Sequence, residues 1–214
     1  MTTRQAKKKW DADGFWVDMA RLAFAPLLIG LRVRPVTPSG EKYRKKLVGG
    51  MMIAANHNGF FDPLILAAVF WYRRVYYLIG EAVMRDKLRE VLLTGAGGIK
   101  VDRTVTDLQA VKKAVSYLKD GRPLVIFPQG GIVPEGEVQQ LKNGAALMAL
   151  TGGVPILPVY IAPRRHWYNR QTVVIGEPFD PAALCSKKIP STADFEKISQ
   201  TLAEAMNACA EGFV

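Results

Sequence analysis

Cysteine and histidine, two reactive residue types, are scarce in this sequence, which contains only two of each. Cys185 and Cys209 are too few and too late in the chain to form a disulfide framework. Neither His57 nor His166 lies near a cysteine in the sequence, so the spacing typical of zinc sites is missing and no metal is expected. No signal peptide is recognisable either. A reducing cytoplasm is therefore the expected compartment.

Long hydrophobic runs are also missing. The uninterrupted apolar run at residues 22–31 has ten residues, whereas a helix needs about 20 to cross a bilayer. This segment could lie on a membrane but is not expected to span one. We find no internal repeat, low-complexity tract or domain linker. A chain of 214 residues fits one domain with one sizeable core.

Acidic residues are outnumbered by basic ones, and the formal net charge is +10. Such an excess implies an anionic partner, which could be nucleic acid, an acidic bilayer or a phosphorylated small molecule. Residues 1–50 hold eleven Lys and Arg against four acids, so most of the excess lies near the amino terminus. Because no nucleic-acid reader motif is present, we expect no nucleic-acid partner.

The first 36 residues are expected to form a basic segment with an amphipathic helix. A polar leader, MTTRQAKKKW, precedes apolar residues at helical spacing: Phe15, Trp16, Met19, Leu22 and Ala23. This composition is typical of a helix that lies in the interface of an anionic membrane. The alternative is an ordinary first helix that packs against the core. Residues 37–214 are then the main domain.

From residue 50 onward, short apolar strands alternate with helical patterns. This order predicts an α/β domain with a mostly parallel central sheet flanked by helices. The expected strands cover residues 51–56, 75–80, 98–102, 124–127 and 155–161, with a further strand and turn in 172–180. The expected helices cover residues 62–70, 84–93, 107–118 and 139–150, with a closing helix from Thr192 or Asp194 to Ala210 after a loop at 182–192.

One junction, AANHNGFFDP at residues 54–63, has the residues for catalysis. A buried strand is expected to end at His57, and Asp62-Pro63 is a helix-start signal. The two side chains can face each other at the carboxyl edge of the sheet, where open α/β sheets bind ligands. A carboxylate that accepts the proton of one imidazole nitrogen leaves the other nitrogen free to act as a base.

No serine or cysteine nucleophile accompanies this pair, because residues 58–61 are Asn, Gly, Phe and Phe. The nucleophile should therefore come from the substrate, as in direct acyl transfer to a hydroxyl without a covalent enzyme intermediate. Taken alone, a histidine at a strand end and an aspartate at a helix start also have ordinary structural explanations.

The pair His57 and Asp62 matches the H-x-x-x-x-D motif of the glycerol-3-phosphate and lysophosphatidate acyltransferase family. Further segments resemble that family's blocks in the same order: GIKVDR at 98–103, FPQG at 127–130, LKNGA at 141–145, VPILPV at 154–159 and VIGEP at 174–178. The resemblance implies an enzyme of phospholipid biosynthesis, bound peripherally to the cytoplasmic face of the cell membrane. It would move an acyl group from acyl-CoA or acyl-carrier protein, with no other cofactor, to a lysolipid such as 1-acylglycerol-3-phosphate.

The resemblance also assigns roles to residues. His57 would be the general base and Asp62 its orienting partner, while Arg103 would bind the acceptor phosphate. Lys100 is a further candidate, although alternate residues of a strand point to opposite faces, so both cations reach one phosphate only if the chain turns between them. The other candidates for substrate binding are Gln129, Gly130, Lys142, Asn58, Phe60 and Phe61, the last two as part of an acyl channel.

The third block departs from the family's usual Phe-Pro-Glu-Gly-Thr-Arg, because Gln129, Gly131 and Ile132 replace its Glu, Thr and Arg. The amide of Gln129 can still form hydrogen bonds, but Ile132 cannot bind phosphate. Losing a charged hydrogen bond costs about 1.5–3 kcal/mol, or roughly ten- to a hundredfold in affinity. Either the acceptor is another lysolipid, or its phosphate relies on Arg103 and Lys142.

A lipid-binding protein that keeps the fold but lacks turnover is the rival hypothesis that the altered third block suggests. The presence of both His57 and Asp62 argues against it.

Overall fold

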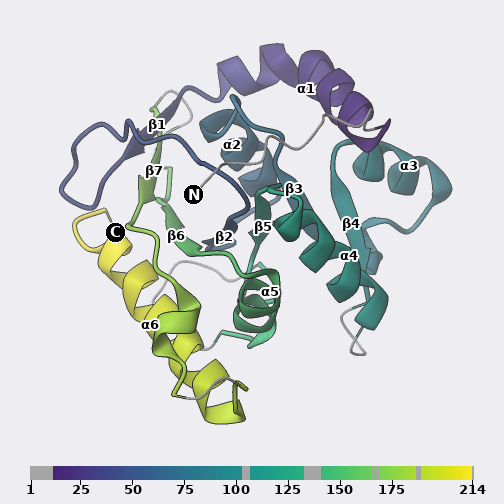
Figure 1. The fold of residues 1–214 in the computed structure, drawn as a ribbon. Helices are drawn as coiled ribbons and strands as arrows, with labels where there is room; N and C mark the ends of the chain where they lie inside the picture. Colours follow the sequence, from purple (N-terminus) through teal and green to yellow (C-terminus); the bar gives the residue numbers. More distant parts are fainter. Residues whose placement is uncertain are drawn as a thin grey trace, which may run out of the picture.

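The computed structural model describes residues 12–102, 107–132, 141–164, 166, 169–186 and 189–213. Its centre is a seven-stranded sheet with the order β1-β7-β6-β2-β5-β3-β4 (Figure 1). All neighbouring strands pair in parallel except β6 and β7. The mostly parallel α/β sheet expected from the sequence is confirmed. The strands are β1 (Val33–Val36), β2 (Met52–Ala55), β3 (Tyr76–Gly80), β4 (Gly98–Val101), β5 (Leu124–Ile126), β6 (Ile156–Ile161) and β7 (Gln171–Ile175).

Helices cover both faces of the sheet (Figure 1). One core cluster joins α2 to one face, and a second joins α4, α5 and α6 to the other. α1 lies over α2, and α3 lies beside β4 at the end of the sheet. The bounds are α1 (Ala12–Gly30), α2 (Asp62–Val69), α3 (Lys87–Gly95), α4 (Leu108–Lys119), α5 (Gly144–Gly152) and α6 (Thr192–Ala210), with short 3-10 helices at Glu81–Val83 and Pro181–Leu184.

The central strand β2 is buried on both sides. Met52 and Ala54 pack into the cluster of α4, α5 and α6, whereas Ile53 and Ala55 pack into the cluster of α2. All four side chains have no exposed surface. A parallel strand covered on both faces needs a continuous apolar run instead of an alternating one, which explains the sequence before His57.

The carboxyl ends of β2 and β5 form the place where a ligand is expected. The two strands are neighbours, yet the helices that follow them, α2 and α5, lie on opposite faces of the sheet. The chain therefore leaves the two strand ends in opposite directions, which is the arrangement at which open α/β sheets bind ligands. His57 follows β2 and Phe127 follows β5, so both residues lie at these strand ends.

Two differences from the expected elements have clear physical reasons. β1 was not predicted, because its four residues include Pro35. The strand lies at the sheet edge, where a missing N–H is tolerated. α5 begins at Gly144 instead of residue 139, because the main-chain N–H of Lys142 donates to the carbonyl of Pro128 at 3.0 Å. That contact holds residues 141–143 beside the β5 loop, while residues 133–140 lie outside the described part.

Side chains cap some of the helices. The carboxylate of Asp107 accepts the N–H of Ala110 at 2.9 Å and caps α4. Asp62 is instead the first residue of α2, whose N-cap position is Phe61 without a side-chain cap. Ser191 caps α6, and Asp194 bonds back to it in a capping box. The predicted loop at 182–192 also contains most of the second 3-10 helix.

The outward side of α1 is apolar. The five residues predicted to share a helix face, Phe15, Trp16, Met19, Leu22 and Ala23, are all exposed, as are Leu27 and Ile29. The polar Asp18 is turned toward the protein instead, where it pairs with Arg74 before β3 and with Arg21. Within the described ranges, no helix combines the length and apolar character needed to cross a bilayer.

Candidate active site

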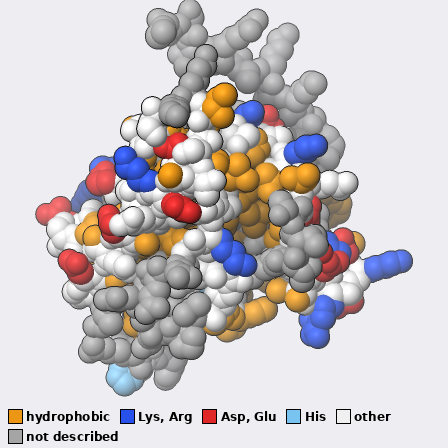
Figure 2. Space-filling view, turned by 90° about the horizontal axis from the view of Figure 1, so that it is seen from below, with side chains coloured by type: hydrophobic (Ala, Val, Ile, Leu, Met, Phe, Trp, Pro, Cys, Tyr) orange, Lys and Arg blue, Asp and Glu red, His pale blue; other side chains and the backbone are white. Residues whose placement is uncertain are grey.

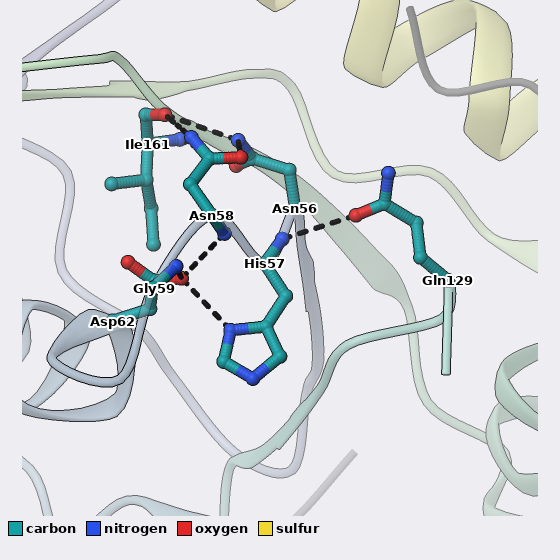
Figure 3. Close-up of polar contacts among 7 residues, drawn as sticks. All are labelled: Asn56, His57, Asn58, Gly59, Asp62, Gln129 and Ile161. Atoms are coloured by element: carbon teal, nitrogen blue, oxygen red, sulfur yellow. Dashed lines mark hydrogen bonds and ion pairs between the residues drawn. The ribbon is translucent and has the colours of Figure 1, made fainter. Parts of the chain in front are cut away.

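His57 and Asp62 meet as the sequence predicted (Figure 3). Nδ1 of His57 lies 2.8 Å from Oδ2 of Asp62. The same oxygen accepts the main-chain N–H groups of Asn58 at 2.7 Å and Gly59 at 2.8 Å. An ionised carboxylate has no proton to donate, so Nδ1 carries the hydrogen. The buried Asp62, 4% exposed, therefore fixes the tautomer of the imidazole.

The second ring nitrogen of His57 is open. In Figure 3, Nε2 points away from Asp62, and no hydrogen bond to it is formed within the described residues. The side chain is 15% exposed, so it is shielded but accessible. A neutral imidazole protonated at Nδ1 has a lone pair at Nε2. The pair can therefore take a proton from a hydroxyl placed next to Nε2.

The loop after β5 supports His57 in two ways. The ring of Phe127 stacks on the imidazole, with centroids 4.2 Å apart and planes at 20°. The main-chain N–H of His57 donates to Oε1 of Gln129 at 3.0 Å. The sequence suggested Gln129 as a substrate ligand, whereas the structure places its carbonyl oxygen on the protein's own backbone.

Side-chain amides hold the opposite side of the same loop (Figure 3). Asn56, 2% exposed, accepts the N–H of Ile161 at 2.6 Å and donates to its carbonyl at 3.0 Å. Asn58 donates to that carbonyl at 3.0 Å and accepts from Asn56 at 3.1 Å. Asn58, suggested as a substrate ligand, thus ties the loop to the end of β6. Asn56 was not among the residues predicted from the sequence, although it directly precedes His57.

A cavity of about 420 Å³ lies on the other side of Phe127 from the residues of the His57 loop, none of which is part of its lining. Phe127 belongs to its wall and also stacks on His57. The view from below, the side on which α4, α5 and α6 lie in Figure 1, shows hydrophobic side chains gathered near the middle of that face (Figure 2). The apolar lining comes from β3, β4, β5, α4, α5 and α6: Leu78, Val101, Ile126, Ala110, Val111, Leu147, Met148 and Phe195. The volume and lining suit a hydrocarbon chain.

Gly130 and Lys142 lie together at this cavity. Gly130 has a positive φ of 80°, and a Cβ there would lie 2.9 Å from Cε of Lys142. The backbone conformation favours glycine at this position, and the flexible end of the lysine side chain lies against it. The exposed ammonium of Lys142 is the cation that the structure places next to the third block.

Lys100 is placed differently from the expectation. Its Nζ lies 3.1 Å from Glu81 and 3.5 Å from Glu90, and the hydrogen bond with Glu81 raises the pKa of its amine. Its neighbour Val101 lines the cavity. Lys100 is therefore already shared between two carboxylates. Arg103 lies outside the described residues, so its role as a phosphate ligand stays a prediction.

The aromatic residues of the loop between His57 and Asp62 face outward. Phe60 is 73% exposed and Phe61 is 55% exposed, and they pack edge to face on each other. Neither lines the 420 Å³ cavity. Partly buried strand residues such as Leu78 and Ile126 line it instead, and no local pattern distinguishes them from ordinary core. His166 is exposed, as expected for a loop residue, and both cysteines are free.

Comparisons with known proteins point to one family. Residues 36–162 match the family model described as Acyltransferase. The chain is 27% identical over 165 residues to a 1-acyl-sn-glycerol-3-phosphate acyltransferase of Bacillus subtilis, covering 74% of this chain and 82% of the relative. A protein of the same name from Borreliella burgdorferi is 28% identical over 148 residues, covering 68% of this chain and 57% of that relative.

A solved structure has the same fold. The crystal structure of the 1-acyl-sn-glycerophosphate (LPA) acyltransferase PlsC from Thermotoga maritima matches with a TM-score of 0.60 and 18% identity. The match covers 97% of this chain and 86% of that chain. At this identity, the likeness supports the architecture alone.

Proposed function

The chain belongs to the acyltransferase family, and on this basis we propose that it transfers a fatty acyl group to the hydroxyl of a lysophospholipid of the 1-acylglycerol-3-phosphate type. The observation that carries the proposal is the His57–Asp62 pair, which Phe127 connects to an apolar cavity. Two relatives that match most of this chain are named for that reaction. We further propose that residues 37–214 form the acyltransferase domain.

The pair supplies general-base catalysis. Nε2 of His57 takes the proton of the acceptor hydroxyl while the hydroxyl oxygen attacks the thioester carbonyl. Asp62 stabilises the imidazolium that forms. When the carbon–sulfur bond breaks, the imidazolium returns its proton to the thiolate. The products are an ester and a free thiol, and no acyl group is attached to the protein at any step.

The donor is proposed to be a thioester, either acyl-CoA or acyl-carrier protein, and no other cofactor is needed. Its acyl chain would lie in the 420 Å³ cavity. Phe127 links the cavity wall to the imidazole, so a chain in the cavity would keep the thioester carbonyl next to His57. Burying an apolar chain there contributes about 0.8 kcal/mol per CH₂ group.

The phosphate of the acceptor is proposed to rely on Lys142, together with Arg103. Lys142 is the exposed cation at the third block, whereas Ile132, at the position of the family's arginine, is apolar and 55% exposed. A lysine binds phosphate as a point charge, so the charge lost at position 132 is partly replaced. This favours a phosphate-bearing lysolipid over a neutral one.

Lys142→Met is expected to raise KM for lysophosphatidate about tenfold, because a hydrogen bond to a charged group contributes about 1.5–3 kcal/mol. KM for a neutral monoacylglycerol should change by less than about twofold, since it has no phosphate. Initial rates measured with each acceptor give both values. Lys119→Met, which removes an exposed cation at the end of α4, is the matched control. An equal change in KM for both acceptors would argue against a phosphate contact.

We also propose that the protein binds the cytoplasmic face of the cell membrane peripherally through α1, without nucleic acid as a partner. The support is the apolar outer side of α1 and the basic residues near the amino terminus, which together suit an anionic lipid surface.

A further inference from the structure

The main chain of His57 lies just beyond the part of the sheet where β2 is hydrogen-bonded to β5. β2 pairs with β5 only as far as Ala54, opposite Ile126, where β5 ends. A residue past that point has no strand partner on the β5 side for its N–H. A shielded N–H without an acceptor is costly, so another group must accept it.

Gln129 supplies that acceptor. Its Oε1 receives the N–H of His57 at 3.0 Å (Figure 3). The donor is a main-chain N–H, so the carbonyl side of the amide must face it, and Nε2 of Gln129 points away. On the other side, Asn56 makes the corresponding bonds to Ile161 at the end of β6. The backbone at His57 is thus held from both neighbouring strands.

From this geometry we propose that Gln129 is a positioning residue for His57 and not a ligand of the acceptor lipid. The inference rests on the proposed function. Only the acceptor oxygen at position 129 is used in this contact, and a carboxylate would offer the same oxygen at the same distance along the side chain. The contact therefore explains why Gln129 can replace the Glu of the family pattern without loss of the active-site geometry.

Loss of the contact between Gln129 and His57 should change the rate of the reaction. A general base must lie within hydrogen-bond reach of the proton that it removes, and small displacements of catalytic groups cost large factors in rate. Loss of the contact at His57 should therefore lower kcat. KM for the acyl donor and for the lysolipid should stay nearly constant, because neither substrate touches Gln129.

Three proteins test the proposal: wild type, Gln129→Glu and Gln129→Met. Methionine has nearly the same length as glutamine, but its thioether is only a weak acceptor. We expect Gln129→Met to have a kcat about tenfold lower, which corresponds to about 1.4 kcal/mol, with both KM values within about twofold. Gln129→Glu should keep kcat within about threefold. Gln200→Met, an exposed glutamine on α6, should behave as wild type.

A second measurement does not depend on turnover. Amide hydrogen exchange at His57, followed by NMR, should be at least tenfold faster in Gln129→Met than in wild type and nearly unchanged in Gln129→Glu. If wild type formed no diacyl product, the proposed function would fail while exchange would still report on the contact. Unchanged exchange in Gln129→Met, or a rise in KM for the lysolipid with kcat preserved, would overturn the positioning role.

Discussion

Replacing His57 with alanine is expected to lower kcat for acyl transfer by about a thousandfold, within the range that general acid–base catalysis contributes. The variant loses the nitrogen that removes the proton from the acceptor hydroxyl. The side chain is 15% exposed and stacks on Phe127, so its removal also costs some stability and folding must be checked. Product formation from an acyl thioester and lysophosphatidate measures the effect, with circular dichroism as the check on folding.

Two further variants make this result specific. Asp62→Asn keeps the size of the side chain but removes the charge that stabilises the imidazolium, so kcat should fall by at least a hundredfold. His166→Ala removes the other histidine, which is exposed in a loop, and should leave kcat unchanged. If His57→Ala kept more than a tenth of the wild-type rate, His57 would not be the base.

The triple substitution Trp16→Ser, Leu22→Ser and Ile29→Ser is expected to weaken binding to anionic vesicles by at least a hundredfold. These side chains on α1 are 61%, 68% and 77% exposed, so little core packing is lost. Each large apolar side chain contributes about 1.5–3 kcal/mol when it leaves water, and about 1.4 kcal/mol corresponds to a tenfold change in affinity. Flotation with vesicles of anionic and neutral lipids measures the bound fraction.

The control substitution for that experiment must lie away from α1 and from its neighbour α3. Trp16 lies next to Gly95 at the end of α3, and α3 also has an exposed apolar face made of Leu88, Val91 and Leu92. Residues on α3 are therefore unsuitable as controls. Ile189→Ser removes an apolar side chain that is 81% exposed, at the start of the segment leading to α6, and should not change binding. Equal flotation of the triple variant and wild type would exclude α1 as the membrane contact.

Much of the fold could be predicted because its determinants are local. The run at residues 51–55 is apolar at every position, as a strand buried on both faces requires, and Asp107 marks the start of α4 with its own side chain. β1 could not be predicted in this way. Its Pro35 is tolerated because the strand lies at the edge of the sheet, beside β7, and that position depends on residues far along the chain.

In the candidate site, too, the contacts between residues close in the sequence could be predicted and the long-range contacts could not. The contact of His57 with Asp62 spans five residues, so a strand end followed by a helix start was enough to predict it. The hydrogen bond that the N–H of His57 donates to Gln129 joins residues 72 positions apart, and the hydrogen bonds between Asn56 and Ile161 join residues 105 positions apart. Both depend on the strand order β6-β2-β5, which alternation of strands and helices does not specify.

The directions of several side chains also could not be predicted from the sequence. Phe60 and Phe61 are apolar and lie between His57 and Asp62 in sequence, yet the loop turns both outward. Lys100 alternates with Val101 along β4, so the lysine meets Glu81 and Glu90 while the valine lines the cavity. The sequence predicted that neighbouring strand residues diverge, but not which carboxylates would meet the lysine.

The most direct test of the proposed reaction counts its two products in one sample. Purified protein is mixed with an acyl thioester and lysophosphatidate in detergent micelles, and free thiol and phosphatidate are measured together. We expect one phosphatidate for each thiol released, and almost no thiol when the lysolipid is left out. Thiol release at the same rate without the lysolipid, or no phosphatidate at all, would contradict direct transfer to the acceptor hydroxyl.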